Sequence, residues 1–207
     1  MKKLGLLLVL SMVMTISSCQ HSNKSENNMK NEVIENIMAR RSIRKYSQQI
    51  PTREILDQIL ECGINAPNGQ NKQSWEIVVV DNPNTMETIK EAMVKGNPSL
   101  DPEMVRGCFR GAPVMIFIAR DTNYDFSPYD CGLLAENIML SAWSLGVGSI
   151  CLGSPVRFLE TSSPECARII EMFGFSQGYK LSLCVGLGYA EESPEAKPRD
   201  KGKIKFL

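Results

Sequence analysis

Residues 66–80, APNGQNKQSWEIVVV, place an amide-rich turn directly before a short β-branched run. The first part combines proline, glycine and asparagine, residues that favour turns and loops. Trp75–Val80 is typical of a buried strand, because aromatic and β-branched side chains pack well on a pleated surface. This stretch therefore predicts a polar loop that leads straight into the central sheet of a globular fold.

Further strands and helices are predicted on both sides of this loop. Because they do not alternate as regular βαβ units, a doubly wound nucleotide fold is disfavoured. We expect an α+β fold, a three-layer α/β sandwich with a mixed central sheet flanked by helices, in a dimer whose core includes the most apolar helix. The expected strands are 75–80, 114–119, 149–152 and 180–189, and the expected helices are 33–38, the segment after Thr52, 84–96, 130–145 and 164–173.

Composition restricts the chemistry. Lysine plus arginine equals aspartate plus glutamate at 23 each, which gives no sign of a nucleic-acid coat or a polybasic membrane surface. The single histidine, His21, lies in a polar segment, so histidine triads and histidine metal sites are excluded. We therefore expect a small-molecule partner, no nucleic acid and no metal.

The N-terminus resembles a bacterial lipoprotein signal. Two lysines precede the apolar run at 4–16, which is shorter than the roughly 20 residues of a membrane-spanning helix. ISSC at 16–19 is similar to a lipobox, which implies a signal peptide over 1–18, lipidation of Cys19 and a lipid-anchored location in the cell envelope. An uncleaved anchor helix is the alternative.

The rest of the chain divides into a flexible polar tether over 19–31 and one domain over 32–207. Six cysteines follow Cys19, none in a CxxC pair and several in apolar runs. We expect packing roles for them and no thiol catalysis, although disulfide pairing of some stays open in an exported chain.

Three polar features suggest a ligand site: the basic cluster at 40–45, the amides at 68–73 and the glycine-flanked strand end at 150–153. Each alone has a plain structural explanation, such as a basic cap on a helix end. Together they suit a ligand that carries a phosphate, a polyol and a flat heteroaromatic edge. Tyr46 and Trp75 are expected in the core instead, and Asp130 is expected to be a helix N-cap.

Four ordered motifs resemble the flavin-dependent nitroreductase family. RRSIRKY at 40–46 is similar to RRSxRxF, and APNGQNKQSW at 66–75 is similar to APSGxNxQPW. GSICLG at 148–153 and KPR at 197–199 complete the set, so the resemblance spans 32–207. Asn68 and Ser74 depart from the serine and the proline of the second motif, both at loop positions.

The resemblance implies an FMN cofactor. On the phosphate side, Arg40 would act with Lys197 and Arg199, while Arg41 and Ser42 would support phosphate and ribityl oxygens.

On the ring side, Arg44 would stabilise negative charge at the N1–C2=O edge of the flavin, and Asn71 would bind the pyrimidine edge. In the family some of these contacts come from the other subunit. The remaining implied cofactor contacts are Pro67, Asn68 and Gln73 in the loop and the backbone groups of Ile150, Leu152 and Gly153.

The implied activity is ping-pong transfer of a hydride from NADH or NADPH through FMN to nitroaromatics, quinones or similar acceptors, with no catalytic side chain. Segments 97–111 and 123–129 are expected to cover the site. Alternatives are a lipoprotein that relays electrons from a non-nicotinamide donor, since reduced nicotinamides are scarce outside the cytoplasm, and a flavin reductive dehalogenase. A third alternative is a structural or adhesive lipoprotein, which would bind no flavin and be colourless.

Overall fold

The structure is a computed structural model that describes residues 31–207. The predicted signal peptide, Cys19 and the tether before residue 31 lie outside the described residues. No helix within 31–207 is both long enough and apolar enough to cross a membrane.

Four strands form one sheet in the order β1-β2-β4-β3, and all three pairings are antiparallel. We expected a mixed sheet, but these strands pair only in the antiparallel sense. Within residues 31–207, the parallel pairing is an isolated bridge between Ser42 and Ser149. The strands are β1 (Trp75–Val80), β2 (Val114–Asp121), β3 (Gly148–Leu152) and β4 (Tyr179–Gly188).

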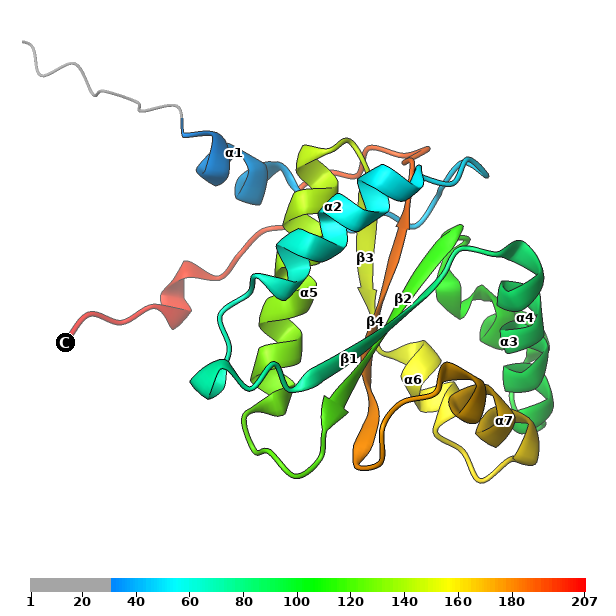
Figure 1. The fold of residues 1–207 in the computed structure, drawn as a ribbon. Coiled ribbons are helices and arrows are strands. Elements are labelled where there is room, and N and C mark those ends of the chain that lie inside the picture. The colour runs from blue at the N-terminus through cyan, green and yellow to red at the C-terminus, as the bar shows by residue number, and fades with distance from the viewer. Residues whose placement is uncertain (1–30) are drawn as a thin grey trace, which may run out of the picture. The chain divides into compact units, whose positions relative to one another are not determined.

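Helices cover both faces of this sheet, so the three-layer α+β sandwich is confirmed (Figure 1). Helices α2 (Arg53–Ile64) and α5 (Ser127–Ser144) lie on one face. The other face carries α3 (Pro83–Gly96), α4 (Pro102–Arg106), α6 (Ser154–Leu159) and α7 (Pro164–Phe173). Residues 31–207 also contain 3₁₀ turns at Gly69–Asn71, Gly107–Phe109 and Lys201–Lys203.

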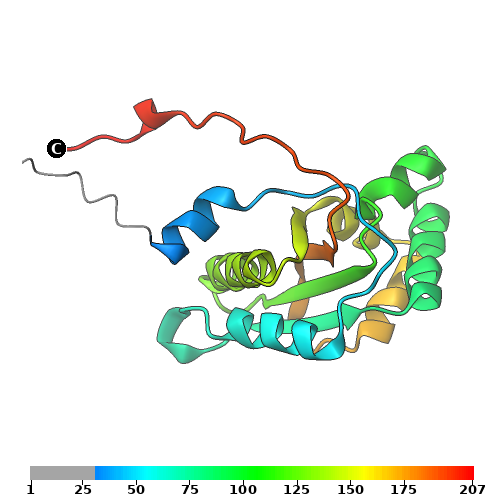
Figure 2. The same ribbon diagram turned by 90° about the horizontal axis from the view of Figure 1, so that it is seen from above.

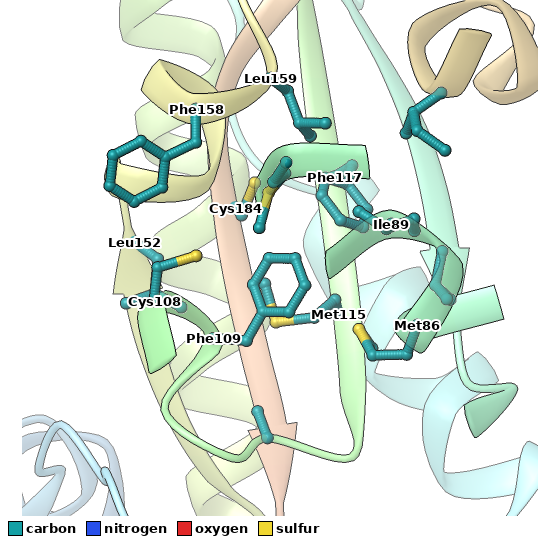
Figure 3. Close-up of a cluster of buried hydrophobic side chains, with 14 of the residues drawn as sticks. Met86, Ile89, Cys108, Phe109, Met115, Phe117, Leu152, Phe158, Leu159 and Cys184 are labelled. Carbon is teal, nitrogen blue, oxygen red and sulfur yellow. The ribbon is translucent and has the colours of Figure 1, made fainter. Parts of the chain in front are cut away.

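Strand β2 divides the core between the two layers because successive side chains point to opposite faces. Met115 and Phe117 join the cluster under α3, α6 and α7, which Figure 3 shows in close-up. Ile116 and Ile118 join the second cluster, under α2 and α5. Tyr46 and Trp75 are buried, as expected from the sequence.

The predicted helices are present, and a side chain caps the N-terminus of several of them. Thr52, for example, accepts a hydrogen bond from the backbone N–H of Ile55 and so starts α2. Helix α6 was not predicted, because six residues are too few to show an apolar period. The prediction that Asp130 caps α5 is wrong: the helix begins at Ser127, and Asp130 lies inside its first turn.

Helix α1 (Glu32–Ala39) and the C-terminal segment extend from the same side of the sandwich (Figure 2). No residue of α1 is buried, although Val33, Ile34, Ile37 and Met38 are apolar. This apolar surface is uncovered in a single chain.

The six cysteines after Cys19 are all free in the described part of the chain. Cys108, Cys131, Cys166 and Cys184 are buried, which confirms their packing role. Cys62 and Cys151 are exposed.

Candidate functional site

The basic cluster lies where the chain leaves α1 and crosses the end of β3. Helix α1 ends because Arg40 takes a non-helical backbone conformation, with φ −53° and ψ 136°. The backbone N–H of Ile43 then donates to the carbonyl of Ser149 at 3.0 Å. Ile43 is fully buried, so it fixes this crossing in the core while its polar neighbours stay at the surface.

The C-terminal segment is led back to the same place by backbone hydrogen bonds. Ser47 donates to the carbonyl of Tyr189 at 2.9 Å, and Glu191 donates to the carbonyl of Lys45 at 3.0 Å. The Glu192 carboxylate also accepts the backbone N–H of Arg44. These contacts bring the predicted KPR motif beside the predicted RRS motif, although about 150 residues separate them.

A pocket of about 410 Å³ lies between the two segments. It gathers five basic residues and one acid, Glu195, so its wall is strongly cationic. Six predicted cofactor residues line it: Arg40, Arg41, Ser42, Arg44, Lys197 and Arg199.

The arginines of this pocket differ in how far their donors are occupied. Arg41 donates to the carbonyls of Met38 and Arg40 at 2.7 and 2.8 Å, and Arg199 donates to the carbonyl of Lys197 at 3.0 Å. Arg44 donates to the carbonyl of Ser42 at 3.0 Å.

Arg40 is the exception. Its Nη1 is buried without a hydrogen-bond partner in the described structure, and its Nε lies 4.0 Å from Oε1 of Glu136 on α5. A buried donor without a partner is unfavourable, so this guanidinium suits an anionic ligand oxygen that enters the pocket.

Cys151 lies near the same two charges. Desolvation raises the pKa of its thiol, and the Glu136 carboxylate adds to this effect while Arg40 opposes it. The residue is exposed, and its raised pKa disfavours the thiolate form.

The amide loop forms a closed turn. The Asn68 side chain accepts the backbone N–H of Gln73 at 2.9 Å and donates to the carbonyl of Ala66 at 3.3 Å. Asn68 thus shapes the loop, and Asn71 and Gln73 remain exposed at its surface. Pro67, which precedes the turn, is also exposed.

The structure does not bring this loop into the basic pocket of the same chain. Gly69 contacts Asp130 in the first turn of α5, whereas Asn36 of α1 donates to the carbonyl of Leu140 near its other end. Ten helical residues span about 15 Å. The two groups of predicted ligand residues therefore contact different turns of one helix, the loop at Asp130 and Arg40 beside Glu136.

The third group lies along and just after β3. Ile150 and Leu152 turn their side chains into the core, so a ligand could contact them only through their backbone groups. Gly153 is exposed at the start of α6. The parallel bridge from Ser42 to Ser149 holds this strand beside the basic cluster.

The two segments that were expected to cover the site, 97–111 and 123–129, lie in different parts of the fold. Segment 97–111 packs into the core through Val105 and Phe109 and does not line the pocket. Segment 123–129 carries the aromatic side chains of Tyr124, Phe126 and Tyr129 beside the amide loop, with Lys72 lying 4.8 Å from the centre of the Tyr124 ring.

Sequence reasoning missed Glu136 and the buried partner role of Ser74. Ser74 donates to Asp130 at 2.6 Å, and both side chains are at most 2% exposed. A serine at a position where proline is expected was the available signal for this contact. No group of three or more metal-ligating side chains comes together within residues 31–207.

The chain is similar to proteins named as nitroreductases and flavin oxidoreductases. A putative NADH dehydrogenase/NAD(P)H nitroreductase of Methanothermobacter thermautotrophicus is 32% identical over 80% of this chain and 81% of its own length. A NADPH-flavin oxidoreductase of Vibrio harveyi is 29% identical over 82% of this chain and 70% of its own.

Solved structures are equally similar. The nitroreductase of Desulfitobacterium hafniense with bound FMN superposes with a TM-score of 0.77 at 32% identity, covering 86% of this chain and all of its own. The FMN-bound nitroreductase of Bacteroides fragilis gives 0.76 at 28% identity, covering 86% and 99%. The model of the Nitroreductase family matches residues 37–189. With the fold, the motif positions and these relatives in agreement, the chain belongs to the Nitroreductase family.

Proposed function

We propose that this chain is an FMN-dependent oxidoreductase that takes electrons from NADH or NADPH and reduces small electron-poor acceptors such as nitroaromatics or quinones, in a ping-pong cycle. The observation that carries the proposal is the basic pocket, in which Arg40 presents a buried donor that has no hydrogen-bond partner among residues 31–207. Relatives named as NAD(P)H nitroreductases and FMN reductases support the choice of donor and cofactor.

The pocket fits the phosphate of FMN. A phosphate monoester carries close to two negative charges at neutral pH and offers three acceptor oxygens. Arg40, Lys197 and Arg199 supply charge, and Ser42 adds a hydroxyl at the same wall. Arg41 is better placed to hold the end of α1, because its Nη1 already contacts two backbone carbonyls.

The residues of β3 and its C-terminal end would hold the flavin ring. When bound, FMN would supply the hydride-transfer chemistry between the nicotinamide and the acceptor. Arg44 would place a positive charge at the pyrimidine edge, and Gly153 would allow the backbone to approach the ring closely. No protein side chain needs to move a proton in this scheme.

We propose that the active form is a homodimer. Helix α1 exposes an apolar row, with Ile34 at 59% and Met38 at 70%, that a second copy would cover. The amide loop does not line the basic pocket of its own chain, and the family resemblance implies that some ring contacts come from the other subunit, so we take a second copy as the source of Asn71 at the ring. Both requirements favour a site built by two chains.

We also propose that Cys19 carries a lipid anchor that holds the domain on the cell envelope. Because reduced nicotinamides are scarce outside the cytoplasm, the identity of the electron donor has to be tested. A lipoprotein that relays electrons from another donor, or a reductive dehalogenase on the same fold, would keep the flavin site and change only the reaction partner.

The test is an anaerobic titration of the purified chain from residue 20. A yellow protein that NADH or NADPH bleaches, and that a quinone or nitroaromatic restores, is expected, with parallel double-reciprocal plots. A colourless protein that does not take up FMN contradicts the proposal. A yellow protein that neither nicotinamide bleaches replaces the reductase by the electron relay.

A further inference from the structure

Asp130 is the one charged residue among the buried polar side chains of residues 31–207. Its side chain is 2% exposed, and no ion pair in the described structure involves it. A buried carboxylate is unfavourable unless hydrogen bonds replace its water. The hydrogen bonds of Asp130 in the first turn of α5 should therefore show why a carboxylate is buried there.

Both oxygens of Asp130 hold the amide loop. Oδ1 accepts the backbone N–H of Gly69 at 3.1 Å, and Oδ2 accepts the hydroxyl of Ser74 at 2.6 Å. Gly69 opens the turn and Ser74 leads into β1. One carboxylate on a rigid helix thus ties the two ends of a short loop.

The loop between these ends is strained. Gln70, Asn71 and Gln73 have positive φ values of 56°, 54° and 48°. Non-glycine residues rarely adopt this left-handed conformation, so three in four positions persist only where the surroundings impose them. The conformation sets where the exposed Asn71 and Gln73 amides point.

A second contact acts on the same segment. A Cβ atom added to Gly69 would lie 2.1 Å from the hydroxyl oxygen of Tyr124, so this aromatic ring packs directly on the turn. The Tyr124 ring therefore restricts the turn at Gly69, where Asp130 also binds it.

We propose that Asp130 is a positioning residue: by binding Gly69 and Ser74 it holds the loop in its left-handed conformation and so presents Asn71 to the flavin ring. The part that concerns flavin rests on the proposed function. The Ser74 hydroxyl completes the clamp in this chain, at the position where the family motif carries proline.

The proposal predicts a loss that differs from loss of the phosphate site. The loop is proposed to contact the flavin ring, which FMN and riboflavin share. Asp130→Ala should therefore weaken the binding of both flavins by the same factor, about tenfold for the loss of hydrogen bonds to a charged group. Asp130→Asn keeps an acceptor for Gly69 and places an amide donor beside the Ser74 oxygen, so it should retain most of the affinity. Ser74→Ala should be intermediate.

Hydrogen–deuterium exchange of the full-length protein without added flavin tests the clamp itself. Peptides that cover 66–76 should exchange at least about tenfold faster in Asp130→Ala than in the wild type and near the wild-type rate in Asp130→Asn. Ile138→Ala is the matched control, because it opens a buried site on the same helix without touching the loop. It should lower Tm and leave loop exchange unchanged.

The outcomes separate the two proposals. Unchanged loop exchange in Asp130→Ala, or equal acceleration in Ile138→Ala, overturns the clamp. If Asp130→Ala does not fold, unchanged exchange in Ser74→Ala overturns it. Faster exchange with unaltered flavin affinity removes the link to the ring. A wild-type protein that binds neither flavin contradicts the proposed function, while the exchange result still decides the clamp.

Discussion

Replacing Arg40 by alanine is expected to weaken the binding of FMN and to leave riboflavin unaffected. The Arg40 side chain is 19% exposed, and its Nη1 has no hydrogen-bond partner in the described structure. By contrast, Arg41 and Arg199 each commit a terminal nitrogen to backbone carbonyls. Arg40 is therefore the pocket cation best placed to bind a phosphate oxygen.

The magnitude follows from the kind of bond that is lost. A hydrogen bond between charged groups contributes about 1.5–3 kcal/mol, and 1.4 kcal/mol corresponds to a tenfold change in affinity. The Kd for FMN should therefore rise about 10- to 150-fold in Arg40→Ala. Arg40→Lys keeps the charge but loses the planar fork, so it should recover part of this loss. Riboflavin lacks the phosphate and should bind both variants as it binds the wild type.

Quenching of flavin fluorescence on titration with the flavin-free protein measures both affinities. Arg53→Ala is the control, since Arg53 is an exposed cation on α2 that pairs with Asp57 at 2.9 Å, away from the pocket. Equal weakening of FMN and riboflavin by Arg40→Ala would show that Arg40 supports the fold and not the phosphate. An unchanged Kd for FMN would remove Arg40 from the site.

Four other predictions concern separate parts of the chain. Arg199→Ala should raise the Kd for FMN less than Arg40→Ala does, because its Nη1 already binds a carbonyl; a larger rise in the same titration contradicts this ranking. Ile34→Glu should convert the proposed dimer to a monomer in sedimentation velocity, because it places a charge in the apolar row of α1; an unchanged dimer excludes α1 from the interface. Burial raises the pKa of Cys108 to about 12 and of Cys131 to about 11, from 9.0. Above pH 9 the unfolded chain loses protons that the folded chain keeps, so the free energy of unfolding should fall as the pH rises from about 9 to about 11 in urea titrations, and a flat profile would refute this. Cys19→Ser should abolish fatty-acid labelling, and persistent labelling rejects the lipobox.

Local sequence was sufficient for most elements of the fold. The β-branched run at Trp75–Val80 and the cap at Thr52 mark their elements directly, because strand burial and helix capping act over a few residues. Helix α6 was not predicted because Ser154–Leu159 is too short to show the apolar period of a helix. Asp130 was misassigned because a carboxylate near a helix start looks the same whether it caps that helix or binds a distant loop.

The sequence by itself determined the family, the four strands and the identity of the basic residues. Only the tertiary structure decided that Lys197 and Arg199 join Arg40, since that meeting depends on the backbone hydrogen bonds from Glu191 to Lys45 and from Ser47 to Tyr189, which carry no sequence signature. It also decided that the amide loop, held at Asp130 of α5, does not line this pocket. Hydrogen bonds between distant segments form through packing, and packing depends on the whole chain.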